Sequence, residues 1–174
     1  LFARTPARRK FLKSEGAETA RINQTIQHVA LAHPGIAFSL TSGERSLTRY
    51  AAMSDPIERV ATVVGQGVES EFLSIDTHVG STRLTGVIGR PSIARGTSRH
   101  LRVFLNGRSI SDATAQHAVR EGFRGLIDPR RFPTAILFLE VDPREVDVNV
   151  HPAKTQVRFR DRELIHALIR RSIR

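Results

Sequence analysis

The chain has 174 residues and is 40% hydrophobic, so it is long and apolar enough to form a globular core. Its 27 lysines and arginines outnumber 17 acidic residues, and the formal charge of +10 indicates a polyanionic partner such as nucleic acid or an acidic membrane surface. The absence of cysteine excludes disulfides and cysteine-ligated metals. No apolar run approaches the ~18 residues of a membrane span. We therefore expect a cytoplasmic protein without a membrane anchor.

The first fifty residues predict two helices and a hairpin. Thr5 as N-cap and Pro6 at the first helical position predict a short helix that ends near Leu12. A longer helix is predicted over residues 16–33, and strands are predicted over 36–40 and 47–50 around a turn at 42–43. Apolar residues recur at i, i+4 and i+7 of the longer helix, so we expect them to form its buried stripe: Ile22, Ile26 and Val29.

The middle of the chain alternates strands with turn residues. Pro56 predicts the start of a helix over 56–64, and Gly65 and Gly67 end it. Residues 89–99 lack periodicity and contain three arginines, so we expect a mobile basic loop. The strands predicted in this region cover 71–77, 82–88 and 101–105, the last ending in a turn at Asn106-Gly107.

The last third predicts a sheet strand and two helices. Asp112 is expected to cap a helix that runs to about Leu126, and the apolar run 134–141 predicts a central strand covered on both faces. Asp161 is expected to cap a final helix with four inward residues: Leu164, Ile165, Leu168 and Ile169. The predicted fold class is α/β, in a two-layer α+β arrangement with a mixed sheet and helices mainly on one face. We expect one domain over residues 1–174, cut from a longer protein.

Lys154 stands out in the run from Asp147 to Phe159. Pro152 cannot donate to a strand ladder, so pairing is expected to stop before it and to leave Lys154 on a short connection between two strands. Only three of the 27 basic residues are lysines, so a lysine here indicates a need for a compact point charge. The alternative is an ordinary solvated lysine.

Three segments of the chain resemble the MutL family of DNA mismatch repair proteins. Leu1-Phe2 with Thr5–Phe11 resembles the family's LF-x-N-T-P-A-R-x-K-F motif, except that Arg4 stands where the family usually has Asn. Leu105–Arg108 resembles its VNGR motif, and Asp147–Phe159 resembles its DVNVHPAK-x-x-VRF signature. These segments are spread over nearly the whole chain. Gly122–Gly125 resembles a family element that belongs further upstream, so no role is carried over to it.

The resemblance implies a function as well as a fold. It implies a ribosomal-protein-like transducer fold, in which Lys154 contacts the γ-phosphate of ATP held with Mg²⁺ mainly by an upstream domain. Lys154 would then be the catalytic and cofactor-binding residue. The resemblance also implies that Arg108 faces a DNA groove, and that the partners are DNA, MutS and a second MutL protomer. The parent is expected to be a DNA-dependent ATPase, whereas this chain alone is expected to lack activity.

The expected DNA surface adds three loop arginines to Arg108: Arg90, Arg95 and Arg99. Aromatic residues make up only 6% of the chain and tryptophan is absent, so we expect contacts to the phosphate backbone rather than base stacking. No metal site is predicted. Two other functions stay open. One is a free-standing basic RNA-binding module. The other is the transducer of a related ATPase such as a topoisomerase subunit, although the sequence His151-Pro152-Ala153-Lys154 argues against it.

Overall fold

The structure is a computed structural model that describes residues 2, 4–65, 67–148 and 156–174. The chain divides into two compact units, Leu1–Ser54 and Asp55–Arg174. The sequence predicted one domain over this length. Each unit is described separately below. Among the described residues, no helix has both the length and the apolarity that crossing a membrane requires.

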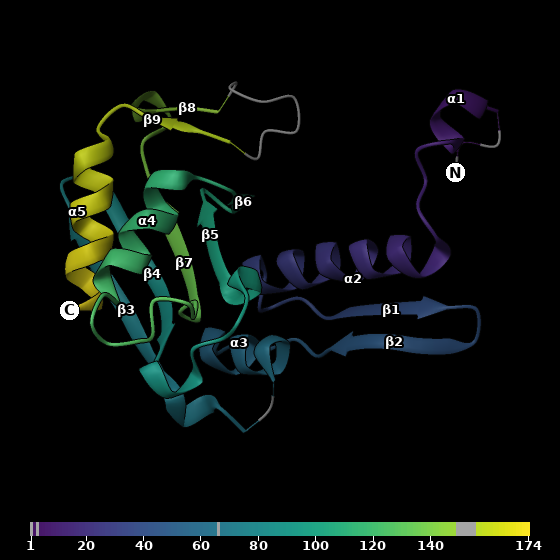
Figure 1. Cartoon of the computed structure of the whole chain (residues 1–174), viewed down its shortest axis with the longest axis horizontal. Helices are drawn as coiled ribbons and strands as arrows, with labels where there is room; N and C mark the ends of the chain where they lie inside the picture. The colour runs from purple at the N-terminus through teal and green to yellow at the C-terminus, as the bar shows by residue number, and fades with distance from the viewer. Residues whose placement is uncertain (1, 3, 66, 149–155) are drawn as a thin grey trace. The chain divides into compact units, whose positions relative to one another are not determined.

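The first unit consists of a short helix, a long helix and a two-stranded hairpin. The Ser14 hydroxyl accepts a hydrogen bond from the Ala17 amide and so caps the N-terminus of the long helix α2. Figure 1 shows α2 running beside the hairpin, and the Thr48 hydroxyl donates to Asn23 Oδ1 at 2.6 Å between them. The elements are α1 Pro6–Arg9, α2 Glu15–Ala32, β1 Phe38–Ser42 and β2 Arg45–Tyr50.

The predicted buried stripe of α2 is wrong. Ile22 is 50% exposed and Val29 is 39% exposed, whereas the fully buried residues are Ala30 and Leu31. Two strands are too few to cover the apolar stripe of an 18-residue helix. The helix α1 also ends earlier than predicted. Such a short helix adds few hydrogen bonds to offset the cost of nucleation.

The second unit is built on a five-stranded mixed sheet in the order β3-β4-β7-β5-β6. The strands β5 and β7 pair in parallel, and every other neighbouring pair in this sheet is antiparallel. The mixed α/β fold predicted from the sequence is therefore confirmed. The strands are β3 Phe72–Val79, β4 Thr82–Gly89, β5 Leu101–Leu105, β6 Arg108–Ile110 and β7 Ala135–Glu140.

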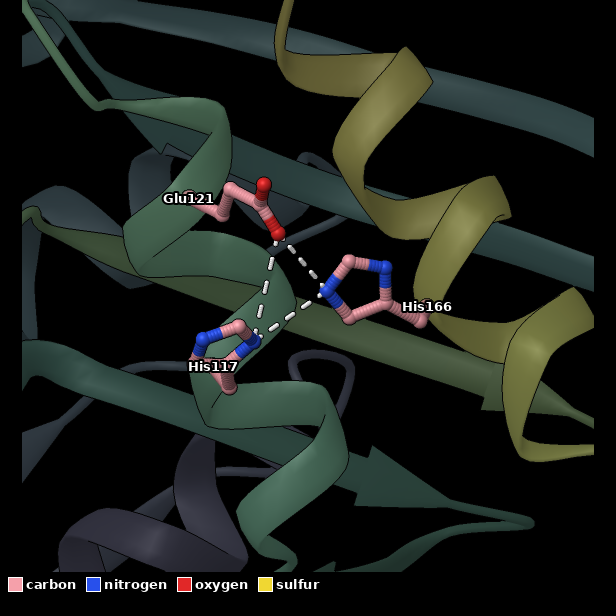
Figure 2. Close-up of side chains that lie close together, drawn as sticks. All are labelled: His117, Glu121 and His166. Carbon is pink, nitrogen blue, oxygen red and sulfur yellow. Dashed lines mark hydrogen bonds and ion pairs between the residues drawn. The ribbon is translucent and has the colours of Figure 1, made fainter.

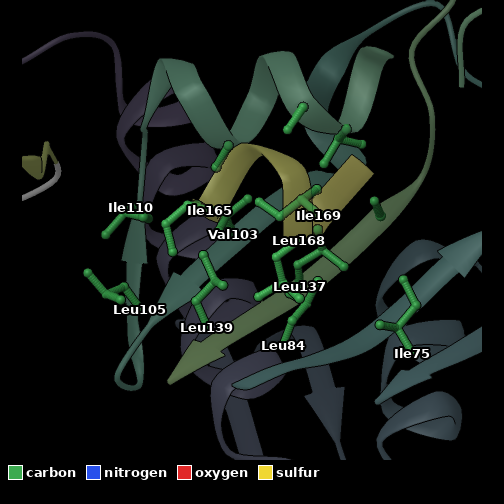
Figure 3. Packing of buried hydrophobic residues seen from close by; sticks show 14 of the residues in the cluster. Ile75, Leu84, Val103, Leu105, Ile110, Leu137, Leu139, Ile165, Leu168 and Ile169 are labelled. Carbon is green, nitrogen blue, oxygen red and sulfur yellow. The ribbon is translucent and has the colours of Figure 1, made fainter. Parts of the chain in front are cut away.

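Two helices cover one face of this sheet. The carboxylates of Asp112 and Asp161 accept from backbone amides at 2.8 and 2.9 Å, so both predicted N-caps are confirmed. Figures 1 and 3 show both helices packed on the sheet, with buried residues such as Leu137, Leu139, Ile165 and Leu168 between the layers. The helices are α3 Pro56–Val64, which contacts β4, and the covering pair α4 Ala113–Gly122 and α5 Arg162–Ile173.

The strand β7 is buried on both faces, as predicted. Ile136 and Leu137 point to opposite faces and are 1% and 0% exposed. The neighbouring strand β4 carries Gly86 at φ +137°, where an added Cβ would lie 2.1 Å from the carbonyl oxygen of Ile136. Only glycine can occupy this position in the centre of the sheet.

The helix α4 ends at Gly122, earlier than the predicted end near Leu126. A Cβ at Gly122 would lie 2.9 Å from Ile173 Cβ, so the missing side chain lets α4 and α5 approach closely. Gly125 then adopts φ +81°, a conformation that stops the helix from continuing.

Short elements connect the main ones. Four short 3₁₀ turns lie in the described parts of the second unit: η1 Glu69–Glu71, η2 Pro91–Ile93, η3 Ser98–His100 and η4 Pro143–Glu145. Two further strands, β8 Val146–Asp147 and β9 Arg158–Phe159, pair with each other in antiparallel orientation.

Candidate nucleic-acid interface

The middle of the second unit is a long segment without acidic residues. Residues 77–111 contain six arginines and neither aspartate nor glutamate, although the chain has 17 acidic residues in total. The segment includes the predicted basic loop and the strands β4, β5 and β6. Positive charge is therefore concentrated on one part of the fold rather than spread evenly.

The predicted mobile loop has a defined backbone. It contains the turns η2 and η3, and Arg95 pairs with Phe132 through two backbone hydrogen bonds of 2.8 and 2.7 Å. The Thr134 hydroxyl also donates to the Ile93 carbonyl at 3.2 Å. These contacts anchor the backbone of the loop to the segment that leads into β7.

Three arginines gather around His100, and we call Arg95, Arg99 and Arg102 the arginine cluster. Burial lowers the pKa of His100 most, and the positive charges of all three arginines lower it further. Burial also lowers the pKa of Arg102, with a smaller effect from Arg99. The cluster is therefore a region of mutual repulsion between like charges.

Some other arginines of the chain are paired with acidic residues, whereas those of the arginine cluster have no acidic partner among the described residues. Arg83 bonds Asp76 through two contacts of 3.1 and 2.8 Å, and Arg144 bonds Asp142 in a similar way. Among the residues that the structure describes, no ion pair involves the cluster, Arg90 or Arg108. Arg95 Nε is buried and has no acceptor in the described part of the chain.

The turn that precedes Arg108 is held by Asn106. Asn106 and Gly107 have φ values of +47° and +80°, which match the hairpin turn predicted for this pair. The Asn106 side chain donates to the Val141 carbonyl at 2.9 Å and accepts from the Val141 amide at 3.0 Å. Its backbone amide donates to the Leu139 carbonyl at 2.9 Å. These bonds tie the turn to the end of β7.

Arg108 does not join the arginine cluster. It lies on the edge strand β6 opposite Leu105, whereas Arg99 lies in the turn η3, which leads into the other end of β5. The five residues of β5 separate these ends by about 17 Å. Arg90 is exposed at the start of η2, and its backbone amide donates to Glu71. The predicted DNA-binding arginines are therefore not gathered at one point: Arg90, Arg95 and Arg99 lie near the starts of β5 and β7, and Arg108 lies by the opposite end of β5.

Lys154 lies outside the described residues, so the structure does not test its role. The described strands on either side, β8 and β9, pair through Val146 with Phe159 and Asp147 with Arg158. Phe159 is 3% exposed and belongs to the core beneath α5. Strands on both sides of the Lys154 connection were predicted, and both are present.

Several residues of interest were missed in the sequence. Arg102 was read only as part of a strand, and the partners of Asn106 lie 35 positions away in the chain. A second group joins the helices α4 and α5 through His117, Glu121 and His166. The i, i+4 spacing of His117 and Glu121 was visible in the sequence, but the packing of α5 on α4 brings His166 to them.

Comparisons with known proteins agree on one family. The profile described as "DNA mismatch repair protein, C-terminal domain" matches residues 60–174. The MutL protein of Neisseria meningitidis serogroup B is 42% identical over 169 residues, which cover 97% of this chain and 26% of that protein. The MutL protein of Sinorhizobium medicae is 42% identical over 175 residues, covering all of this chain and 29% of that protein. The chain thus spans less than a third of these relatives.

Solved structures share the fold. The N-terminal domain of a DNA repair protein superposes with a TM-score of 0.78 at 19% identity, covering 99% of this chain and 57% of that one. The Aquifex aeolicus MutL ATPase domain complexed with ADP gives a TM-score of 0.64 at 23% identity, covering 97% of this chain and 54% of that one. The family profile and the two MutL relatives show that the chain belongs to the MutL family of DNA mismatch repair proteins.

Proposed function

We propose that this chain acts in DNA mismatch repair as the part of a MutL protein that binds the DNA backbone and senses bound nucleotide. Membership of the family supports the repair setting. The observation that carries DNA binding is the arginine cluster, because three arginines held together without acidic partners attract a polyanion. The RNA-binding alternative is not favoured, since the family acts on DNA.

The arrangement suits contacts to phosphates rather than to bases. From Arg99 to Arg108 the arginines extend over about 17 Å, a length along which duplex DNA presents roughly ten phosphate charges. The neighbouring aromatic rings already pack against other side chains, which leaves them poorly placed to stack on bases. Phe104 stacks on Phe138 with ring centroids 5.0 Å apart, and Phe132 lies under the Arg120 guanidinium at 5.1 Å. Binding should therefore be salt-sensitive and indifferent to sequence.

Salt titration of DNA binding tests this part of the proposal. Arg99→Gln and Arg108→Gln should each weaken binding to every duplex sequence and reduce the slope of log affinity against log salt by about 0.9 per lost phosphate contact. Arg83→Gln is the matched control, because it removes the same charge from an arginine already paired with Asp76.

Equal losses in all three variants would show that only net charge matters, and would refute an interface at the arginine cluster. A loss confined to some DNA sequences would indicate base contacts instead. Tighter binding to structured RNA than to duplex DNA would favour the alternative function.

We also propose that Lys154 contacts the γ-phosphate of ATP, with Mg²⁺, in the whole protein. The support is the family motif and the predicted position of Lys154 between two strands. A lysine that touches only the γ-phosphate distinguishes ATP from ADP, so nucleotide state can bias the arrangement of domains. This relay is the transducer role, which makes Lys154 a participant in ATP turnover. MutS, a second MutL protomer and a cytoplasmic location belong to the same proposal.

Nucleotide affinities in the whole protein test the role of Lys154. Lys154→Ala should weaken binding of a non-hydrolysable ATP analogue by about ten- to a hundredfold and leave ADP affinity nearly unchanged, because ADP lacks the contacted group. Lys154→Arg should restore part of the difference, since its charge is present but more diffuse. Equal effects on the two nucleotides would remove Lys154 from the γ-phosphate.

A further inference from the structure

The outer edge of the α4–α5 contact carries two histidines and a glutamate. His117 and Glu121 are one helical turn apart on α4, and His166 faces them from α5 (Figure 2). The close approach of the two helices at Gly122 and Ile173 lies next to Glu121 in the sequence. Side chains from two helices therefore converge on one point.

Three potential ligand atoms meet at distances that suit a metal ion. His166 Nε2 lies 3.0 Å from Glu121 Oε2 and 3.2 Å from His117 Nδ1, and His117 Nδ1 lies 4.0 Å from Glu121 Oε2. Ligands about 2.0–2.1 Å from a tetrahedral zinc ion are separated by about 3.3–3.4 Å. Two of the distances are slightly shorter than this, and a small rotation of His117, whose side chain is 65% exposed, would shorten the third.

Hydrogen bonding alone satisfies this group poorly. A single proton on His166 Nε2 can point to Glu121 or to His117, but not to both. A cation at the centre would accept a lone pair from all three atoms together. Two imidazoles and one carboxylate form a recurring zinc ligand set, and the same set also holds iron(II).

We propose that His117, Glu121 and His166 bind a zinc-class divalent ion that clasps α4 to α5. A water molecule would take the fourth position, because the site is partly exposed. The ligands come from helices 49 positions apart in the sequence, so the ion binds the folded arrangement and stabilises it. Four arginines on the same helices oppose binding by charge: Arg120, Arg162, Arg170 and Arg171. The Arg120 guanidinium lies over the Phe132 ring, 5.1 Å from its centroid.

Metal binding to the 174-residue chain, prepared without a histidine tag, tests the proposal. Zinc should bind in one equivalent, raise the melting temperature and be removed by a chelator. Cobalt(II) should bind at the same place and develop the visible absorption of a tetrahedral nitrogen and oxygen site. Each of His117→Asn, Glu121→Gln and His166→Asn should weaken binding by at least about ten- to a hundredfold, the range seen for changes even outside the ligand shell.

The control is His78→Asn, which removes an exposed histidine on β3 outside the group. The His78→Asn variant should bind zinc with the wild-type affinity and show the same zinc-induced rise in melting temperature. Absence of saturable zinc binding in the micromolar range would overturn the proposal. So would binding that survives all three ligand substitutions, or that is lost equally in the His78 variant. Circular dichroism of each variant without metal would separate loss of a ligand from loss of the fold.

Discussion

Asn106 allows the sharpest test of how the arginine-bearing edge of the sheet is held. Its side chain satisfies both backbone groups of Val141, a residue that is 6% exposed, while its own backbone adopts φ +47°. Three substitutions separate these contributions. Asn106→Gly removes the two hydrogen bonds and tolerates the positive φ, Asn106→Ala adds backbone strain, and Asn106→Asp removes only the donor.

The expected losses of unfolding free energy follow from these roles. A buried backbone group left without a partner costs about 1–3 kcal/mol, and water reaching this turn reduces the cost. Asn106→Gly should therefore cost about 2–4 kcal/mol. Asn106→Ala should cost about 1–2 kcal/mol more because of the left-handed backbone. Asn106→Asp should cost about 1–3 kcal/mol, since the Val141 amide keeps an oxygen acceptor whereas the Val141 carbonyl loses its side-chain donor.

Urea unfolding followed by circular dichroism measures these differences. Since the chain has two compact units, the transition of the second unit must be resolved before the free energies are compared. Asn106→Gly within about 0.5 kcal/mol of the wild type would refute the role given to the side chain. Equal stability of the Gly and Ala variants would show that the left-handed turn is relaxed without cost.

Three further predictions concern close packing and pH. Gly86→Ala should lower the unfolding free energy by at least about 3 kcal/mol, because the new Cβ would meet the Ile136 carbonyl. The control Gly80→Ala should cost about 1 kcal/mol, since this positive-φ site has open space around it, and equal melting temperatures of the two variants would contradict the prediction. Gly122→Ala should cost about 1 kcal/mol net, as overpacking against Ile173 exceeds the gain in helix propensity, and Ile173→Ala should remove the penalty of that change in a double-mutant cycle. The pKa of His100 is held below its ordinary value of 6.5, so as the pH falls the unfolded chain protonates this histidine before the folded chain does, and stability should decrease below about pH 6.5. The slope of stability against pH in this range should be shallower in His100→Gln and unchanged in His78→Gln.

Local signals determined the type and order of most elements. Asp112 and Asp161 predicted two helix starts, because a carboxylate at the N-cap accepts hydrogen bonds from the unpaired backbone amides of the first turn. The Asn106-Gly107 pair predicted its turn because few residues adopt positive φ easily. The apolar run around Leu137 predicted a strand buried on both faces. Each of these features depends on neighbours in sequence, which is why they could be read directly.

Tertiary packing decided what local patterns could not. Ile22 and Val29 have the spacing of a buried stripe, yet a two-stranded hairpin does not cover them. The loop containing Arg95 lacks periodicity, yet pairing with Phe132, 37 positions away, holds it in place. The same packing assembles the arginine cluster around His100 and brings His166 to His117 and Glu121. Sequence spacing shows which residues can share a face of one element, whereas contacts between distant elements depend on how the sheet and its helices pack together.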